Sequence, residues 1–495
     1  MDVATPSLPA VPPFRLRARV LTPLAARGTR YLADGVVDVD SRGRIVRVAA
    51  WSGASRPTTG GSEPGTPASE PPALVVGHTG DGVNRVAGAA DVPVHDLRPW
   101  LLLPGLVDLH THVPLLPNAG GGAGLDLLTW LERYTFPLEA RFDAEAAERL
   151  GPLAMRAFAG AGTTTVVAWS SADPGAAEAL LRAAETHGIR AVIGLVLMRR
   201  TRVVGAPRDD SGAASTSGGP DDDPDDSGDE TAGLRASADL AARWHGRDHG
   251  RLRFGFTPRF ALSCSAGVLQ ASARMAAEAG AHWLTHLSED PREIEEVRRA
   301  FPEARDYLDV YDRAGALGPG GPRALFAHAI HLSEREIERL AGSGAGVAHC
   351  PASNLFLPSG IMPLARYLEE GIPVGLGSDV SGGPDVSIFE AMRVGAYSQQ
   401  ALHVVGHDPR PLLDPLGWLR LGTLGGAEAL GLADTIGSLE AGREADMIAV
   451  DPSLTEPMPG AASGDDPAEI VGRLIFRTHP QMVRGAWVRG RLLPA

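Results

Sequence analysis

Two histidines stand one residue apart in the stretch PGLVDLHTH, directly behind a run of aliphatic residues. Side chains alternate between the two faces of a strand, so His110 and His112 share one face with Asp108. If that face lines a barrel, both imidazoles lie at the carboxyl end of the strand, where barrel enzymes keep their active sites. Taken alone, a His-X-His pair is equally typical of the polar rim of an ordinary strand.

Further polar side chains follow strand-like apolar runs elsewhere in the chain. They are His286 and Glu289 in WLTHLSE, His328 in LFAHAIHLS, His349 in GVAHCPASN and Asp379 in VGLGSD. In a parallel barrel these groups would point into one cavity. Three neutral imidazoles and a carboxylate suit zinc or another divalent first-row ion, so the pattern predicts a metal centre. His349 either supports a neighbouring ligand or packs within its own strand end.

The elements that must position these residues form a repeating pattern. Short apolar runs alternate with amphipathic stretches over residues 104–432, which predicts a (β/α)8 TIM barrel. Strand-like segments in residues 1–103 and 433–495 are expected to pair in a small β-sandwich domain built from both chain ends. Residues 52–75 have low complexity and are predicted to be a disordered loop. The acidic stretch 207–231 is predicted to be a disordered, solvated insertion in the barrel.

Charge and cysteine content exclude several classes of protein. The net charge is −14, and nine acids against one arginine in residues 207–231 supply −8 of it. The remainder contains no basic stripe, so we expect no nucleic-acid partner. No apolar run is long enough to cross a membrane, and the start of the chain does not resemble a secretory signal. Two cysteines fit a reducing cytoplasm and exclude a cysteine-built zinc site. All 46 basic residues are arginine, so no lysine takes part in the chemistry.

The motifs as a set resemble those of the amidohydrolase superfamily, from Arg15 to the C-terminus. They are PGLVDLHTH, THLSE, AHAIHLS, AHCPASNL, GLGSD and GSLEAGREADMIAVD. Within the superfamily, LDLLTWLERYTFPLEARF, TPRFALSC and HCPASNLFLPSG are most similar to the guanine deaminases. The resemblance implies one zinc ion, with Fe²⁺ as an alternative, held by His110, His112, His286 and Asp379. It also implies a homodimer. Two-metal members bridge their ions with a carbamylated lysine, so a chain without lysine should be a one-metal member.

The resemblance further implies a mechanism. Zinc lowers the pKa of its bound water toward about 7. Glu289 would move a proton from that water to a ring nitrogen of the substrate, and Asp379 would take the remaining proton as ammonia leaves. His328 would hydrogen-bond the oxygen as it gains negative charge. Asp108, on the same strand face as the first ligands, is a candidate acceptor for a ligand histidine. The expected reaction converts guanine to xanthine and ammonia.

Substrate contacts are expected from two segments. In TPRFALSC, Arg259 offers donors for an oxo group and a ring nitrogen, and Phe260 offers a stacking face. The place of Arg259 at a strand end argues against the alternative of a solvated surface arginine. Guanine deaminases usually carry a glutamine where this chain has Leu115, and leucine cannot hydrogen-bond the purine edge. Either Asn118 substitutes from the same loop, or the substrate is another C–N compound: a pterin, an aminotriazine, an adenosine derivative or a cyclic amide.

Other polar and aromatic residues near these motifs are open to more than one interpretation. For Trp130 in LLTWLERY, packing on the apolar face of an amphipathic helix is the favoured interpretation, and stacking on a substrate is the second one. Ser353 and Asn354 in PASNL either line the pocket or cap the next helix. A non-catalytic scaffold would be expected to have lost some of the ligand, acid and base residues, and this chain retains all of them.

Overall fold

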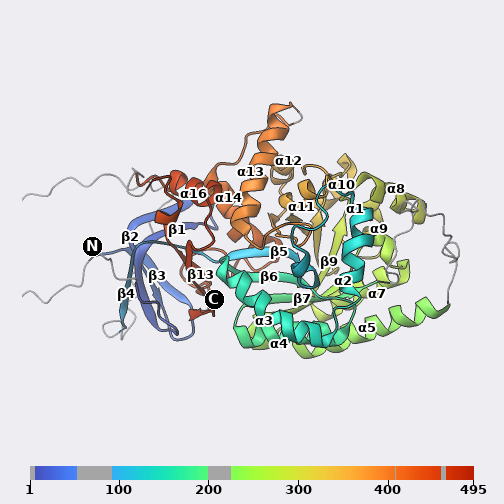
Figure 1. The fold of residues 1–495 in the computed structure, drawn as a ribbon, viewed down its shortest axis with the longest axis horizontal. Helices are drawn as coiled ribbons and strands as arrows, with labels where there is room; N and C mark the ends of the chain where they lie inside the picture. Colours follow the sequence, from blue (N-terminus) through green and yellow to red (C-terminus); the bar gives the residue numbers. More distant parts are fainter. Residues whose placement is uncertain (1–5, 53–91, 199–223, 407, 459–463, 495) are drawn as a thin grey trace, which may run out of the picture.

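A computed structural model describes residues 6–52, 92–198, 224–406, 408–458 and 464–494. The described chain forms two β-sheet units that lie side by side (Figure 1). Residues 53–75 of the predicted low-complexity loop and residues 207–223 of the predicted acidic insertion lie outside the described residues. From Pro224 onward the chain is helical instead of a loop, because proline is compatible with a first helical turn.

The larger unit is a barrel of eight parallel strands, each paired with the next along the chain. The strands are β5 (Leu106–His112), β6 (Thr163–Trp169), β7 (Arg190–Leu197), β8 (Leu252–Pro258), β9 (His282–Leu287), β10 (Arg323–His328), β11 (Gly346–His349) and β12 (Val374–Leu376). Backbone hydrogen bonds close the ring, from Asp379 N–H to His110 O at 2.8 Å and from His112 N–H to Val380 O at 3.1 Å. The predicted (β/α)8 barrel is confirmed.

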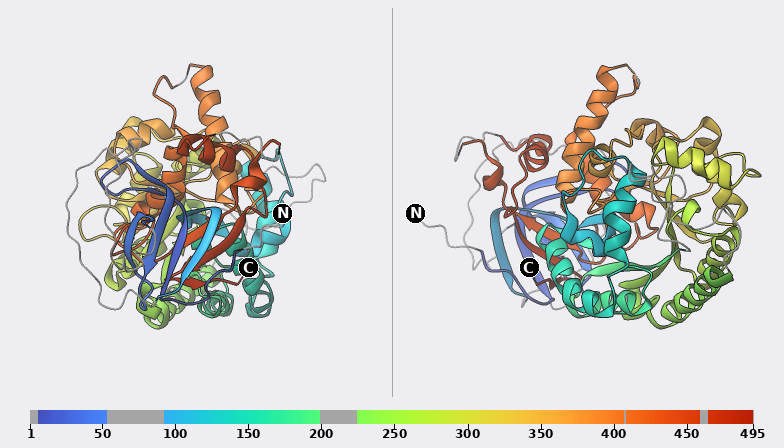
Figure 2. Two further views of the ribbon diagram at one scale, coloured as in Figure 1. Left: turned by 90° about the vertical axis from the view of Figure 1, so that its left-hand side faces the viewer. Right: turned by 45° about the vertical axis from the view of Figure 1, so that its right-hand side comes forward.

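Helices cover the outside of the barrel (Figures 1 and 2). They are α3 (Ala144–Gly160), α4 (Pro174–His187), α5 (Pro224–Trp244), α6 (Arg247–Gly250), α7 (Ala266–Ala279), α8 (Pro291–Ala300), α9 (Tyr307–Arg313), α10 (Glu334–Ala341), α11 (Pro351–Phe356), α12 (Leu364–Glu369) and α13 (Ile388–Val404). Side chains at the N-caps satisfy free backbone N–H groups; Asp173 caps α4 and Ser265 caps α7. Short helices follow the first and last barrel strands: α1 (Leu127–Trp130), α2 (Phe136–Glu139), α14 (Pro415–Arg420) and α15 (Gly426–Ala429). Helix α16 (Pro467–Phe476) lies between the last strands of the chain and contacts α14.

The smaller unit combines strands from both ends of the chain in one seven-stranded sheet. Its order is β15-β14-β13-β4-β1-β2-β3. The strands are β1 (Phe14–Pro23), β2 (Thr29–Val39), β3 (Ile45–Ala50), β4 (Val94–Pro104), β13 (Met447–Val450), β14 (Val483–Val488) and β15 (Arg491–Leu492). Buried side chains such as Phe14, Trp100 and Trp487 form its core. The predicted pairing of the two chain ends is confirmed, and in Figure 1 the red C-terminal strand β13 lies beside the blue N-terminal strands.

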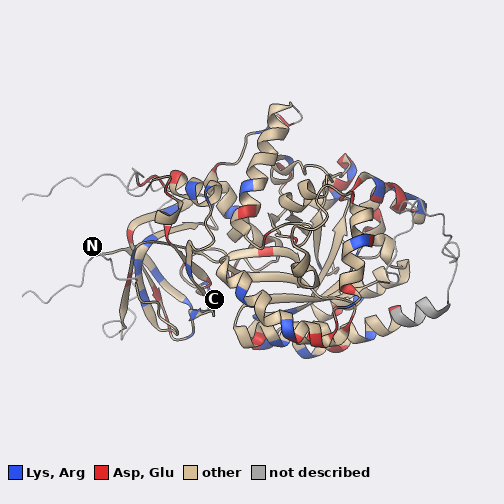
Figure 3. Cartoon of the chain, viewed as in Figure 1, with Lys and Arg blue, Asp and Glu red and all other residues tan. Residues whose placement is uncertain are grey.

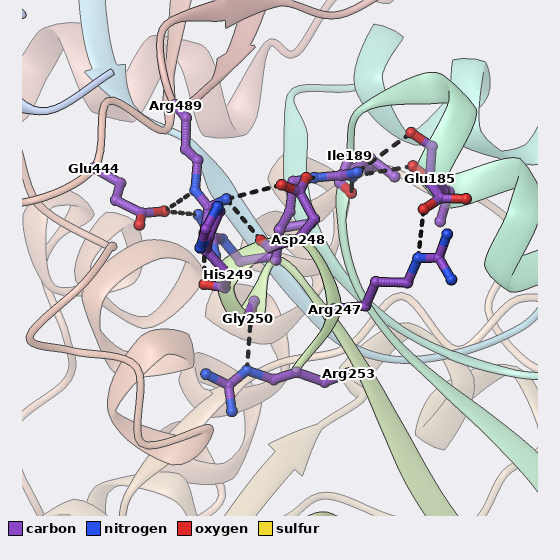
Figure 4. A network of polar contacts seen from close by, with 12 residues as sticks. Glu185, Ile189, Arg247, Asp248, His249, Gly250, Arg253, Glu444 and Arg489 are labelled. Atoms are coloured by element: carbon purple, nitrogen blue, oxygen red, sulfur yellow. Dashed lines mark hydrogen bonds and ion pairs between the residues drawn. The ribbon is translucent and has the colours of Figure 1, made fainter. Parts of the chain in front are cut away.

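A buried ion network joins the small sheet to the amino-terminal end of the barrel. Arg190, the first residue of β7, contacts Glu444 at 2.5 Å and Asp446 at 2.8 Å. Arg489 contacts Glu444 at 2.7 Å and donates to the carbonyl oxygens of Asp248 and His249, each at 2.8 Å (Figure 4). Removing one member of such a buried network leaves a charge without a partner, so the network fixes how the two units meet.

Charge on the described surface is mixed in sign. Figure 3 shows arginines and acidic residues interspersed along outer helices such as α8. Within the described ranges, none of the helices combines the length and the apolarity needed to cross a bilayer.

Candidate metal centre and active-site cavity

His110 and His112, at the end of the first barrel strand β5, lie close to Asp379, which follows the last barrel strand β12. His110 Nε2 lies 3.2 Å from His112 Nε2 and 3.2 Å from Asp379 Oδ1. His112 Nε2 lies 3.5 Å from the same carboxylate oxygen. All three side chains are buried at the carboxyl ends of their strands. The ring nitrogens of His110, His112 and His286 lie within 4.8 Å of one another, as do ligand atoms of His110, His328 and Asp379.

These distances fit a bound cation. Nitrogen ligands around a tetrahedral zinc ion at 2.0–2.1 Å lie about 3.3 Å from one another. Burial lowers the pKa of His110 and of His112, so both imidazoles are neutral, as metal ligands must be. Burial alone would raise the pKa of Asp379, but the nearby His110 and His328 hold it below its ordinary value. The donor set therefore suits a divalent first-row ion.

The ring of His286 is oriented by the backbone of Arg259, which follows the neighbouring strand β8. Its Nδ1–H donates to the backbone carbonyl of Arg259 at 2.6 Å, which leaves Nε2 free to face the other ligands. The indole of Trp169, at the end of β6, packs against three of the rings. Its centroid lies 4.5 Å from that of His286, 4.9 Å from that of His110 and 5.0 Å from that of His112. Trp169 therefore forms an apolar wall behind the ligands.

His328 and Glu289 lie on the open side of this cluster. His328 Nε2 is 3.4 Å from Glu289 Oε2 and 3.7 Å from Asp379 Oδ2. Its Nδ1–H donates to Asn354 Oδ1 at 2.9 Å. Burial, followed by the negative charges of Asp379 and Glu293, raises the pKa of Glu289 well above its ordinary value. Glu289 therefore keeps its proton to a higher pH than an ordinary glutamate does.

The backbone is strained at two of these positions. His328 has a φ of 69° and Asp379 a φ of 47°, both in the left-handed region that residues with a Cβ rarely adopt. Each such residue costs on the order of 1–3 kcal/mol and persists only where the surroundings hold it. Strain at two strand ends that face one cavity is typical of a functional site.

A cavity opens beside the cluster. Its lining includes polar side chains, among them Arg259, Glu289 and Asp379. The rest of the lining forms an apolar wall of side chains that pack in one cluster: Leu115, Leu127, Trp130, Leu131, Phe260 and Leu357. Asn118 is not among the lining residues, and its amide instead donates to Ser381 Oγ at 3.3 Å. Trp130 lies in helix α1, as expected, but its ring also lines the cavity.

Arg259 is a buried cavity residue and not a solvated one. It is 2% exposed, and its Nη1–H donates to Glu139 Oε1 at 2.5 Å. Its guanidinium carbon lies 5.6 Å from the centre of the Phe136 ring. Phe136 and Glu139 are the first and last residues of α2, so one short helix supplies both the apolar face and the counter-charge that fix the guanidinium.

The comparisons with known proteins agree with this geometry. Residues 101–493 match the model of the amidohydrolase family. The chain belongs to the amidohydrolase family. This amidohydrolase is 38% identical to a protein named probable guanine deaminase from Deinococcus radiodurans, over 73% of this chain and 76% of that protein. It is 33% identical to the Escherichia coli guanine deaminase, over 74% of this chain and 76% of that protein.

Solved structures show the same fold. The structure of E. coli guanine deaminase superposes with a TM-score of 0.77 at 26% identity, covering 97% of this chain and 99% of that one. Guanine deaminase from Bradyrhizobium japonicum gives a TM-score of 0.79 at 26% identity, covering 97% of this chain and 98% of that one. The predicted membership of the amidohydrolase superfamily, with the guanine deaminases as the most similar group, is confirmed.

Two sequence-based expectations about supporting residues need correction in this amidohydrolase. Asp108 does not accept from a ligand imidazole; it accepts from Ser378 Oγ–H at 2.6 Å, from Ser378 N–H at 3.0 Å and from His110 N–H at 3.2 Å. Burial raises its pKa to about 7. Ser353 and Asn354 lie inside α11 and do not cap it, and Asn354 contacts His328.

His349 packs at the end of β11. It is buried, and neither ring nitrogen has a hydrogen-bond partner among the described residues. Burial, with a smaller contribution from His328, lowers its pKa to about 3, so the ring is neutral. Its side chain is not among those that line the cavity. These observations favour the packing interpretation over a contact with a ligand.

Proposed function

We propose that this amidohydrolase is a metal-dependent hydrolase that removes the amino group from a heterocycle, with guanine as the first substrate and xanthine and ammonia as products. One observation carries the proposal: a set of metal donors and a buried glutamate with a raised pKa face the same cavity. The relatives named guanine deaminase, at 33% and 38% identity over about three quarters of the chain, supply the choice of substrate.

The metal site would use His110, His112, His286 and Asp379, and we assign one zinc ion to it, with Fe²⁺ as the alternative occupant. A bound divalent ion supplies Lewis-acid activation of a water molecule. The neutral imidazoles and the ionised Asp379 suit that ion without any change in protonation.

Glu289 is the proton carrier in this proposal. Because burial raises its pKa, it can donate a proton to a ring nitrogen of the substrate and take one from the attacking water. Asp379, whose pKa lies below its ordinary value and which lies 3.7 Å from His328, accepts the second proton and passes it to the amino group, which leaves as ammonia.

His328 stabilises the oxygen that gains negative charge. Its hydrogen bond to Asn354 Oδ1 requires a proton on Nδ1. Its Nε2 lies 3.4 Å from Glu289 Oε2 and 3.7 Å from Asp379 Oδ2, so this nitrogen is the one that faces the reacting oxygen.

Substrate recognition relies on Arg259 and Phe260. The guanidinium, held by Glu139, presents its remaining donors to an oxo group and an adjacent ring nitrogen. The phenyl ring of Phe260 stacks on the flat heterocycle. Asn118, bonded to Ser381, would have to leave that contact to read the substrate edge.

A second substrate class is favoured by Leu115. This side chain is 1% exposed and belongs to the apolar cavity wall, where it cannot pair with a polar edge of guanine. An unpaired polar edge costs on the order of 1–3 kcal/mol. Pterins, aminotriazines, adenosine derivatives and cyclic amides that place a carbon-rich edge against this wall are therefore the alternative substrates.

The test is a substrate panel with metal-replete protein. Guanine, a pterin, an aminotriazine and an adenosine derivative are incubated separately, and both ammonia and the loss of substrate absorbance are measured. Ammonia from guanine that disappears after chelation and returns with zinc is the expected result. Ring opening without ammonia would indicate cyclic-amide hydrolysis instead. If no substrate of the panel released ammonia or lost absorbance, the proposal would be contradicted.

We also propose that the enzyme is a cytoplasmic homodimer without nucleic-acid partners. The subunit count rests on the resemblance to guanine deaminases, and the location on the two free, buried cysteines. Light scattering on size-exclusion chromatography measures the subunit count directly, and a mass of one subunit at micromolar concentration would contradict the dimer.

A further inference from the structure

Helix α9 presents two tyrosines to the segment that carries a metal donor and the proton carrier. Tyr307 and Tyr311 are four residues apart and therefore lie on one face of the helix. Both are buried, and their rings pack with a centroid distance of 5.5 Å. That face points at residues 286–290, which comprise the last two residues of β9 and the turn after it.

Tyr311 anchors the first end of this segment. Its hydroxyl donates to the backbone carbonyl of His286 at 2.8 Å. The hydroxyl of Thr285 lies 3.3 Å away and donates to the same phenolic oxygen. The ring is fixed by packing on Trp283 and Phe326, with centroid distances of 5.3 and 5.7 Å. The donor His286 is thus held at its backbone as well as through its ring.

Tyr307 anchors the other end through a carboxylate. Its hydroxyl donates to Glu293 Oε1 at 2.7 Å. Glu293 Oε2 accepts from the N–H groups of Glu289 and Asp290, at 3.0 and 3.3 Å. Glu293 is buried beside the cavity, where each oxygen is committed to a donor from the protein.

The segment between the two anchors is strained. Ser288 has a φ of 47°, in the left-handed region that a residue with a Cβ rarely adopts. A strained turn keeps its shape only where its surroundings hold it. The N–H groups of Ile330 and His331 hold the turn itself by donating to Ser288 O, each at 3.1 Å. The contacts from one helix face and one carboxylate are added to these, and they end on the backbones of His286 and Glu289.

We infer that Glu293, Tyr307 and Tyr311 are positioning residues that set where His286 and Glu289 stand relative to each other. This inference rests on the proposed function, because it assigns the two positioned groups to metal binding and proton transfer. None of the three hydrogen-bonds to the reacting atoms; each acts through the backbone that carries them. Two arms follow, joined by a 3.5 Å hydrogen bond between the Tyr311 and Tyr307 hydroxyls: Tyr311 supports the metal donor, and Tyr307 with Glu293 supports the proton carrier.

The experiment compares Tyr311→Phe, Tyr307→Phe and Glu293→Gln in the full-length, zinc-loaded enzyme. Tyr31→Phe is the matched control, because its hydroxyl pairs with Arg19 in the small sheet, far from the cavity. We measure the rate of zinc loss to a chromogenic chelator, kcat and KM for the substrate found by the panel, and the Tm. Removing a partner that supports a metal ligand typically costs about 10- to 100-fold in affinity or activity.

The two arms predict different losses. Tyr311→Phe should release zinc about tenfold faster or more, whereas Tyr307→Phe and Glu293→Gln should retain zinc and lose about tenfold or more in kcat with KM within about twofold. The double variant of Tyr307 and Glu293 should lose no more than the worse single variant, because both belong to one arm.

Several results would overturn the inference. If all three variants match Tyr31→Phe in zinc loss and kcat, or if they lower Tm alone, the tyrosines are merely structural. If kcat and zinc retention fall together in every variant, the two arms do not exist. Absence of activity in the wild-type enzyme is a failure of the proposed function instead, and the zinc-loss comparison for Tyr311→Phe still decides that arm.

Discussion

Glu139 Oε1 accepts a hydrogen bond from Arg259 Nη1 at 2.5 Å, and both side chains are buried. The same oxygen lies 3.8 Å from His112 Nδ1, which has no hydrogen-bond partner among the described residues. Burial raises the pKa of Glu139, and the charge of Arg259 opposes that shift. One carboxylate therefore lies between the side chain assigned to the substrate and a donor assigned to the metal.

Replacing Glu139 should affect substrate binding first. Glu139→Gln keeps an acceptor for Arg259 but removes its counter-charge, and a charge-assisted hydrogen bond is about 1 kcal/mol stronger than a neutral one. We expect KM to rise about fivefold with a smaller change in kcat, as measured by steady-state kinetics. Arg259→Lys serves as the paired variant. The double variant should be less impaired than the sum of the two single variants, and strict additivity would show that the pair does not act together.

Glu289→Gln should separate chemistry from metal binding. The amide has the shape of the carboxyl group but carries no transferable proton, and general acid–base catalysis contributes about 10²- to 10⁴-fold. We expect a loss of kcat in that range with the zinc content unchanged by elemental analysis. His286→Ala is the contrast, since it should lose zinc as well as activity. A fully active Gln variant would remove Glu289 from the mechanism.

The polar residues at the strand ends were predictable from local sequence alone. Side chains alternate between the two faces of a strand, and a polar residue that follows an apolar run lies at the mouth of a parallel barrel. This rule does not depend on which residues the polar side chain contacts there. His110, His286, His328 and Asp379 all follow this rule, and the structure brings them together. Trp169 is the last residue of the apolar run TTTVVAW, so its position at the mouth of the barrel was predictable in the same way, although its side chain is apolar.

The supporting contacts were not predictable in the same way. Glu139 reaches Arg259 across 120 positions of the chain, and Asn354 reaches His328 across 26. No local period encodes such a partner, because the contact exists only once the barrel has closed. Asp108 is a further example: its hydrogen bonds to Ser378 depend on the segment that follows the last barrel strand, 270 positions away in the chain.

Leu115→Gln tests the apolar wall. A glutamine there can pair with a polar purine edge, and one hydrogen bond contributes about 0.5–1.5 kcal/mol. We therefore expect KM for guanine to fall about three- to tenfold. The Tm should also fall, because a polar group enters an apolar cluster. Leu357→Gln, on the same wall, is the control. An equal gain at both positions would mean that polarity and not a specific pairing lowers KM.

His282 should make the fold sensitive to acid. Burial lowers its pKa to about 3, whereas the unfolded value is about 6.5. Between these values the unfolded chain binds a proton that the folded chain does not. The contribution of the neutral His282 to the free energy of unfolding is therefore fully present above about pH 6.5 and decreases as the pH drops. One such group contributes a slope of up to about 1.4 kcal/mol per pH unit.

The measurement is urea unfolding of His282→Gln and wild type at pH 7 and pH 5, with chelator in every sample. The variant should lose less stability between the two pH values than the wild type. His95→Gln, at a partly exposed position of β4, is the control and should follow the wild type. Identical pH slopes for His282→Gln and wild type would show that this imidazole titrates normally in the fold.

In the small sheet, Pro104 at the end of β4 pairs with Met447 at the start of β13. At about 5–20 residues per second, a ribosome needs roughly 20–70 seconds to translate the roughly 340 intervening residues. Throughout that interval the edge of β4 that receives β13 is bare on the nascent chain, and bare edges attract other strands. Efficient expression of this protein should therefore depend on how well chaperones shield the N-terminal strands until translation ends.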